Sequence, residues 1–323
     1  MMSLFSRFLK FCFFILSFVF ADIGPVDATT FIAGMGRSGT TWVEEVINYN
    51  HDYRIIFEPF HAFRVADAFC FKYHNYIRPE TVDPTLEKQA RIILSGHVQN
   101  SWTDHDKKSL RYSKRIIKDI RCNLMLGWIK KLLPDMPLVL LVRHPLSVTH
   151  SWERLNWGVA EGSDRTDFEL ITSQNELLDD YPIIREAMQK INKSSALETT
   201  LFIWCVSYYV PFKQLNPGDA YIISYEEAVL NPEPTFKSLF NYLGVKFNWN
   251  EIHDILNTPS ETNFLLRDFA QKEQKEKVLF GWKSRYSDEE LKRANLILEM
   301  FGLQKIYDRD GFPSKNLQSL LNS

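Results

Sequence analysis

The sequence predicts a single α/β domain with a mainly parallel β-sheet flanked by helices and a P-loop-like nucleotide-binding architecture. Apolar, β-branched segments alternate with amphipathic segments after the first strand, at residues 53–57, 115–121, 138–142 and 220–224. A glycine-rich turn joins the first strand to the first helix within residues 29–50. This alternation indicates parallel strands with right-handed crossovers. The ligands of such a sheet bind at the carboxyl ends of its strands.

The composition is that of an ordinary globular protein, with 45% hydrophobic and 24% charged residues in 323. The formal net charge is −2, so no basic field favours nucleic acid as a partner. The four cysteines show no metal-ligand spacing and indicate no redox compartment. The sequence therefore predicts an enzyme-like domain over residues 29–310, followed by a tail over 311–323, without a metal site.

Residues 1–22 form a separate apolar segment, in which Arg7 and Lys10 precede an apolar run that Asp22 follows. Eleven apolar positions are short for a membrane span, which needs about 20. The length suits a signal peptide with cleavage near Ala21, or a short signal-anchor through residues 4–21. Either alternative predicts a membrane-associated or secretory-pathway protein, and the third alternative is a plain N-terminal extension.

The glycine turn has the chemistry of a phosphate-binding loop. Gly34, Gly36 and Gly39 permit positive φ and a close backbone approach to an anion. In the triphosphate motif G-x-x-x-x-G-K-S/T, Gly34 and Gly39 fit the outer glycines, but Thr40 stands where the lysine should be. Ordinary ATP or GTP chemistry is therefore disfavoured.

The positive charge of this loop lies on Arg37 instead. Hydroxyl groups surround it, on Ser38, Thr40 and Thr41. Trp42 begins the buried face of the following helix. The loop thus suits a phosphate ester that has no γ-phosphate, and such a ligand needs a second anchor elsewhere.

A candidate for the second anchor follows the most apolar strand, residues 138–142. Arg143 lies at the tip of that strand, Pro145 suits a first helical turn, and Ser151 comes about two turns later. Arg143 and Ser151 together could grip a second phosphate. The alternative is an arginine at the edge of the sheet and an unrelated serine on a helix surface.

Glu58 ends the second strand, immediately before Pro59. If that strand is parallel to the first, Glu58 lies on the same edge of the sheet as the glycine loop and could act as a base. The alternative is that Glu58 caps a following helix over residues 61–71.

Three further segments carry expectations. The polar residues 156–180 are an excursion that shapes the acceptor site. Residues 197–215 predict a long aromatic helix that Pro211 kinks or ends. Residues 258–281 have no clear hydrophobic periodicity and are expected to form a flap. The capping box at residues 287–290 predicts the start of the last helix.

Taken in order, these signals resemble the sulfotransferase family, whose donor is 3′-phosphoadenosine-5′-phosphosulfate (PAPS). Gly36-Arg37-Ser38-Gly39-Thr40-Thr41-Trp42 resembles the family's 5′-phosphosulfate loop. Arg143 and Ser151 resemble its 3′-phosphate clamp. Tyr225-Glu226-Glu227 resembles an element near the adenine, and residues 280–291 resemble the C-terminal tryptophan-lysine segment.

Within the family, the chain is more similar to the carbohydrate and tyrosyl-protein branches than to the cytosolic phenol branch. Arg37 replaces the loop lysine of the phenol enzymes, and residues 118–121 lack their histidine base. The resemblance implies Glu58 as the base and Arg37 with the loop amides as stabilisers of the leaving phosphate. The basic patch that usually precedes the C-terminal tryptophan is diluted here to Lys275, Glu276 and Lys277.

The resemblance also implies a PAPS donor without a metal, and an acceptor with a free hydroxyl. A glycan, a lipid head group, a peptide tyrosine or a small alcohol would each satisfy it, and a carbohydrate-type acceptor is expected. Two other functions stay open: a P-loop kinase that acts on a small molecule, and a catalytically silent binding protein of the same fold.

Overall fold

The computed structural model describes residues 21–105, 109, 111–159, 161–162, 164–256, 279–314 and 317–321. The apolar run before Ala21, most of the expected flap and the diluted basic patch at residues 275–277 lie outside these ranges. None of the helices in the described ranges is both long and apolar enough to cross a membrane.

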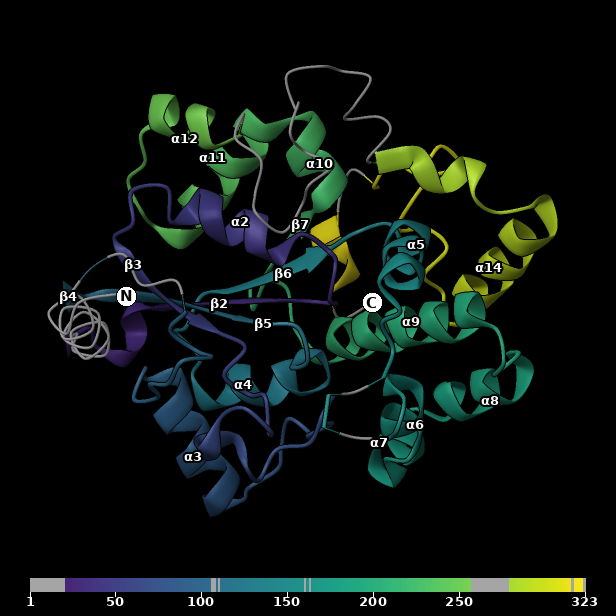
Figure 1. Ribbon diagram of the computed structural model, residues 1–323, viewed down its shortest axis with the longest axis horizontal. Helices are drawn as coiled ribbons and strands as arrows, with labels where there is room; N and C mark the ends of the chain where they lie inside the picture. The colour runs from purple at the N-terminus through teal and green to yellow at the C-terminus, as the bar shows by residue number, and fades with distance from the viewer. Residues whose placement is uncertain are drawn as a thin grey trace, which may run out of the picture.

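Five parallel strands form the central sheet, in the order β3–β5–β2–β6–β7 (Figure 1). Their bounds are β2 Thr29–Gly34, β3 Tyr53–Phe57, β5 Lys114–Asp119, β6 Leu138–Val142 and β7 Tyr221–Ser224. A second, two-stranded sheet pairs β1 (Ala21–Asp22) with β4 (Arg111–Tyr112). All carboxyl ends of the five strands therefore meet at one edge, as the sequence predicts.

The sheet is buried on both faces because its strands are apolar throughout. Phe31 and Ala33 of β2 point into one core, and Ile32 between them points into the other. Leu140 and Leu141 of β6 divide in the same way. The two-residue period of a strand thus assigns each side chain to one of two cores.

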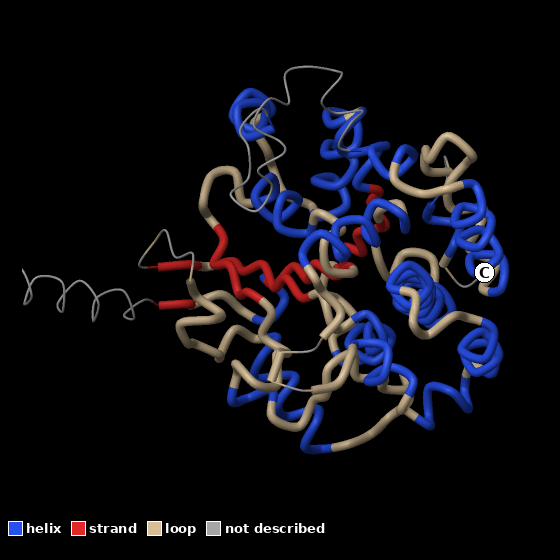
Figure 2. Tube along the Cα trace, turned by 45° about the vertical axis from the view of Figure 1, so that its right-hand side comes forward, coloured by secondary structure: helices blue, strands red, loops and turns tan. Residues whose placement is uncertain are grey.

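Helices cover both faces (Figures 1 and 2). One core includes side chains from α2 (Thr40–Ile47), α10 (Tyr225–Leu230), α11 (Pro232–Leu243) and α12 (Trp249–Leu256). The other includes side chains from α3 (Pro84–Leu94), α4 (Leu126–Leu132), α5 (Pro145–Leu155), α6 (Asp167–Thr172), α7 (Asn175–Asp180), α8 (Pro182–Lys190), α9 (Ala196–Gln214) and α14 (Asp288–Met300). The fold is the predicted parallel α/β domain.

The segments at both ends of the predicted domain pack against it. Asp22 forms ion pairs with the buried Arg54 at 2.9 Å and Arg115 at 2.7 Å. Near the other end, the Gln318 amide exchanges hydrogen bonds with the backbone of Ile222, and Leu317 is buried. Side chains from outside residues 29–310 thus contribute to the folded unit.

The prediction of a helix over residues 61–71 is wrong. Turns occupy this stretch, with a single 3₁₀ turn over Ala66–Ala68. The carboxylate of Asp119 accepts a hydrogen bond from the Phe60 amide, and the Phe60 and Phe71 rings stack edge to face. These contacts hold the chain in a compact loop, so the aromatic side chains decide its path.

Other expectations hold with small changes. The segment 156–180 contains α6 and α7 rather than loop alone. The long aromatic helix continues beyond Pro211 to Gln214, so the proline precedes its end by one turn. The predicted capping box opens α14, with hydrogen bonds in both directions between Ser287 and Glu290.

Candidate active site

The glycine loop lies between β2 and α2 and has the backbone shape of an anion cradle. Two residues adopt positive φ, Arg37 at 72° and Gly39 at 96°. A Cβ atom at Gly39 would lie 2.4 Å from the Tyr225 ring, so only glycine fits there. Left-handed residues turn successive N–H groups towards one point, and α2 begins with its N-terminus there.

Tyr208 of α9 supports this loop from within the protein. Its hydroxyl accepts a hydrogen bond from the Met35 amide at 3.2 Å, shares one with Ser38 Oγ at 3.1 Å and donates one to the Leu141 carbonyl at 2.9 Å. The predicted donor-binding hydroxyl of Ser38 is therefore buried and engaged in fixing the loop. Trp42, also a predicted donor-binding residue, lies in the core against Tyr225.

The predicted second anchor meets the loop through Arg37. Arg143 donates from Nη1 to the Arg37 carbonyl at 3.0 Å, and Arg37 donates from Nε to Ser151 Oγ at 3.1 Å. The Arg143 guanidinium also lies over the ring of Tyr225, 4.4 Å from its centroid. The structure thus brings Arg143, Ser151 and Tyr225 to the glycine loop.

The glycine loop therefore has two arginine side chains beside it, the buried Arg143 and the partly exposed Arg37. Burial, and then the charge of Arg143, lower the pKa of Arg37 below its ordinary value. Like charges held this close favour a bound anion, which would offset their repulsion. The arrangement suits one or two phosphate groups.

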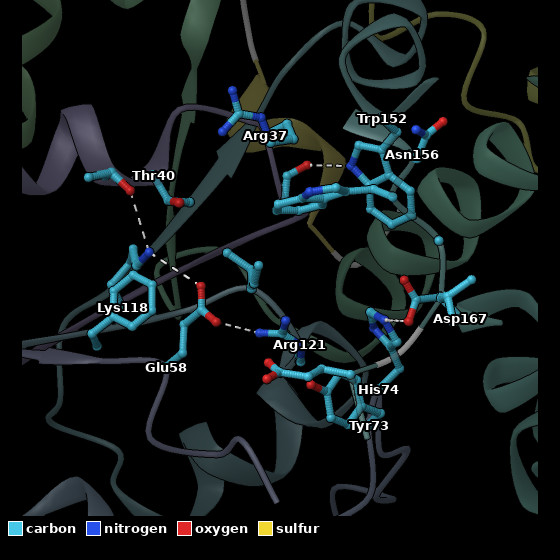
Figure 3. A pocket seen from close by; sticks show the side chains of 18 of the residues that line it. Arg37, Thr40, Glu58, Tyr73, His74, Lys118, Arg121, Trp152, Asn156 and Asp167 are labelled. Carbon is cyan, nitrogen blue, oxygen red and sulfur yellow. Dashed lines mark hydrogen bonds and ion pairs between the residues drawn. The ribbon is translucent and has the colours of Figure 1, made fainter. Parts of the chain in front are cut away.

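Glu58 is buried at the end of β3 with an unusual backbone, at φ 42°. Its Oε2 pairs with Arg121 Nη1, and its Oε1 lies 3.5 Å from Lys118 Nζ (Figure 3). A non-glycine residue at positive φ is strained, and such strain is concentrated at functional sites. Because no helix forms over residues 61–71, Glu58 has no capping role there.

Lys118 connects Glu58 with the glycine loop. Its Nζ donates to Thr41 Oγ1 at 3.4 Å and lies 3.8 Å from the Phe57 ring centroid. The loop has no lysine of its own, so Lys118 supplies an ammonium group from β5 (Figure 3). In Figure 3, Thr40 lies near the Lys118 ammonium group, and Arg37 lies above both.

Lys118 and Arg121 are not among the site residues predicted from the sequence. A usable signal existed, because two cations at the end of a central strand must lie beside the loop that follows the neighbouring strand. Despite burial, the charge of Glu58 raises the pKa of Arg121 above its ordinary value. Burial, and then the charge of Glu58, raise the pKa of Asp119, the last residue of β5.

These groups face one cavity of about 440 Å³, a size typical of small-molecule sites. The cavity is lined by residues of the glycine loop, by aromatic side chains and by part of the segment 156–167. It is also lined by Glu58 with its partners Lys118 and Arg121, which together form the Glu58 cluster. The lining residues are Gly36, Arg37, Thr40, Thr41, Phe57, Glu58, Tyr73, His74, Trp102, Lys118, Ile120, Arg121, Trp152, Asn156, Trp157, Gly158, Val159, Glu161 and Asp167. The predicted polar excursion therefore does contribute a wall of the site.

Comparison with known proteins identifies the family. The family model described as "Sulfotransferase family" matches residues 30–251, more than half of the chain. The chain belongs to the sulfotransferase family. No curated protein matches it.

Solved structures that resemble this sulfotransferase do so at low identity. A sulfotransferase domain from the curacin biosynthetic pathway is 15% identical, with a TM-score of 0.46, and the match covers 86% of this chain and 99% of that one. A mouse sulfotransferase complexed with PAP is 16% identical, with a TM-score of 0.42 and coverage of 89% and 88%. A sulfotransferase from Alicyclobacillus acidocaldarius is 12% identical, with a TM-score of 0.42 and coverage of 85% and 93%.

Next to Arg143 in the sequence, His144 connects the end of β6 with the C-terminal segment. Its ring stacks on Trp282 with centroids 4.1 Å apart, and its amide donates to Glu226 Oε1 at 2.9 Å. Tyr307 donates to the other oxygen of Glu226 at 3.0 Å. Burial, and then the charges of Lys283 and Arg143, lower the pKa of His144 to about 3, so the ring is neutral.

Within the described ranges, no group of three or more His, Cys, Asp or Glu side chains could hold a metal ion. On the side of the cavity next to the glycine loop, the chain offers the loop amides, the cations of Arg37, Lys118 and Arg121, and the Glu58 carboxylate. These groups suit the binding of an anionic donor beside a base.

Proposed function

We propose that this protein transfers a sulfuryl group from PAPS to a hydroxyl of a carbohydrate-type acceptor. The observation that carries the proposal is the placing of Glu58, Lys118 and the glycine loop around one cavity. A group that can take a proton thus faces the groups that can stabilise a leaving phosphate. Membership of the sulfotransferase family supports the same reaction class.

The residues of the loop and the clamp fit a donor with two separate phosphate positions. The loop cradle and the N-terminus of α2 suit the 5′ end of PAPS. Arg143 and Ser151, which meet the loop through Arg37, suit its 3′-phosphate, because arginine pairs well with phosphate oxygens. Glycine is required at position 39 because the Tyr225 ring fills the space that a Cβ would take, and this packing holds the loop in its cradle shape.

When bound, PAPS supplies the sulfuryl group that the acceptor receives. Glu58 accepts the proton of the acceptor hydroxyl as the new oxygen–sulfur bond forms and the bond between sulfur and the 5′-phosphate oxygen breaks, with 3′,5′-adenosine bisphosphate as the leaving group. Lys118 and Arg37 stabilise the negative charge that develops on the leaving phosphate side, and the loop amides assist them. Arg121 orients the Glu58 carboxylate.

A carbohydrate-type acceptor is supported by the lining of the cavity. Aromatic rings of Tyr73, Trp102 and Trp157 alternate with polar side chains such as His74 and Asn156. Aromatic faces pack on the apolar faces of sugar rings, while hydroxyls need polar partners. Glu58 in the base position also follows the carbohydrate branch, as the resemblance implies.

The family match argues against the small-molecule kinase. Glu58 facing the glycine loop across one cavity argues against the silent binding protein, because mere nucleotide binding does not need it. We also propose that the N-terminal apolar segment directs the enzyme into the secretory pathway or to a membrane. Mass spectrometry of the N-terminus of the mature protein tests that proposal.

Two measurements test the proposed reaction. Calorimetry with 3′,5′-adenosine bisphosphate (PAP) and with Mg-ATP should show tight binding of PAP alone. Transfer from radiolabelled PAPS to a panel of glycans, lipids and phenols should give a labelled glycan. Preference for Mg-ATP would reject the donor, and PAP binding without transfer to any acceptor would favour a silent protein.

A further inference from the structure

The side of the cavity away from the glycine loop holds a pair of polar groups that the proposed reaction does not use. His74 Nε2 lies 3.4 Å from Asp167 Oδ1, and both side chains are buried (Figure 3). His74 precedes α3 by ten positions and Asp167 begins α6, so only the fold brings them together. His74 has φ 50°, a strained value for a non-glycine residue.

Asp167 has unused hydrogen-bonding capacity. A carboxylate offers about four acceptor positions, and His74 is the one side chain of the described residues that contacts it. Burial raises its pKa, but the hydrogen bond and charge of His74, together with the charge of Arg121, outweigh this, so the pKa lies below its ordinary value and the group is anionic. A buried anion with one partner gains strongly from further donors.

The start of α6 does not explain this carboxylate. Thr166 is the N-cap, and Glu169 completes a capping box with hydrogen bonds in both directions. Helix α6 is thus capped without the Asp167 side chain, which lines the cavity instead.

The cavity that Glu58 and Asp167 share is also lined by the apolar or aromatic side chains of Tyr73, Ile120 and Trp157. A saturated sugar ring suits such a space, because its C–H faces pack on aromatic rings while hydroxyls project from its edges. A flat phenol has one hydroxyl and would leave Asp167 with no donor besides His74.

We propose that Asp167, oriented by His74, accepts a hydrogen bond from a second hydroxyl of the acceptor while the first hydroxyl faces Glu58. The inference rests on the proposed sulfuryl transfer and deepens it. The acceptor is then a ring with at least two hydroxyls, and Asp167 selects it over monohydroxylated phenols and alcohols. A site built to bond a hydroxyl discriminates strongly against analogues that lack it.

The test compares p-nitrophenyl β-D-hexopyranosides, the same glycosides lacking one hydroxyl, and 2-naphthol as acceptors with PAPS. One deoxy position should lower kcat/KM of the wild-type enzyme about 10-fold or more, as expected for a hydrogen bond to a charged group. Asp167→Asn should raise KM for the parent glycoside by a similar factor. That variant should turn over the same deoxy glycoside as well as the wild type does.

Glu169→Ala is the matched control, because it removes the side chain that completes the capping box of α6 without touching the cavity. If Asp167 served only the helix, both variants would lose the same activity. His74→Gln should give a smaller rise in KM than Asp167→Asn, with PAP affinity unchanged within twofold in all variants.

Three results would overturn the inference. If removal of each hydroxyl in turn lowered kcat/KM of the wild type by the same factor, the inference would be overturned by the wild type alone. Parent KM unchanged in Asp167→Asn would also do so, as would transfer to 2-naphthol and to no glycoside, which leaves the donor assignment intact. Failure of the proposed function is a different result, in which the wild type does not bind PAP, or binds it and transfers sulfate to no acceptor at all.

Discussion

The side chain of Arg37 leaves the glycine loop and donates a hydrogen bond from Nε to Oγ of Ser151, 3.1 Å away. The carbonyl of the same arginine accepts from Arg143 at 3.0 Å. The two predicted phosphate anchors are therefore parts of one hydrogen-bonded unit rather than separate sites. Substitutions in this unit should be coupled in their effects on donor binding.

Arg143→Ala should weaken PAP binding about 10- to 100-fold, because it removes a charged contact to phosphate and frees the Arg37 carbonyl. Isothermal titration calorimetry measures the affinity. Arg185→Ala is the control, since Arg185 of α8 forms an exposed ion pair with Asp179 of α7. Equal PAP affinity in wild type and Arg143→Ala would exclude the clamp. Ser151→Ala should add little once Arg37 has been replaced by alanine.

Glu58→Gln should lower kcat by about 100-fold or more, the usual contribution of a positioned general base, and leave PAP affinity near normal. Steady-state transfer from labelled PAPS measures the change. Glu80→Gln, at an exposed carboxylate that pairs with Lys131, should behave as wild type. Unchanged turnover in Glu58→Gln would reject Glu58 as the base.

Lys118→Met should lower the single-turnover rate by about 100- to 1,000-fold, the cost of losing one group that stabilises developing charge. Methionine keeps an unbranched side chain of similar length beside Phe57 but removes the ammonium group and its cation–π contact with the ring. Lys118→Arg should recover part of the rate. A Lys118→Met enzyme as fast as wild type would show that the contact with Thr41 is only structural.

Gly39→Ala should abolish tight PAP binding, because a Cβ there would meet the Tyr225 ring at 2.4 Å and the loop would have to move. Gly218→Ala is a matched control, since Gly218 has nearly the same φ, 95°, and a Cβ atom there would meet nothing within 4 Å. Both changes carry backbone strain of about 1–2 kcal/mol. Only Gly39→Ala should alter PAP affinity in calorimetry, and equal affinities would count against a tight loop.

The protein should lose stability as the pH falls below about 6.5. The pKa of His144 is lowered to about 3, so between these values the unfolded chain binds a proton that the folded chain does not. At pH 5 the loss is about 2 kcal/mol. His61, whose burial lowers its pKa to about 4, acts in the same direction. Thermal melting between pH 7.5 and 5 measures the slope.

His144→Phe should flatten that slope, because phenylalanine keeps the stacking on Trp282 but takes up no proton. A slope as steep as in the wild type would show that other groups cause the pH dependence. The comparison uses the change in Tm with pH rather than the absolute Tm, which the substitution also alters.

Much of the site was predictable because its residues stand at marked places in the chain. The glycine loop follows a buried strand, Arg143 ends another and Glu58 ends a third. In a parallel sheet all three positions meet at one edge. The mistaken helix over residues 61–71 shows the limit of this reasoning, because hydrogen bonds and ring contacts with distant residues decide a path that local propensity does not.

The sequence by itself determined the alternation of strands and helices along the chain, the anion-binding loop and the carboxylate that faces it. Periodicity and glycine positions report these features because they act over a few neighbouring residues. Only the tertiary structure decided that Lys118 from β5 supplies the ammonium group that the loop lacks, and that Arg37 joins Ser151. It alone brought His74 beside Asp167, since contacts between residues about a hundred positions apart depend on how the whole chain packs.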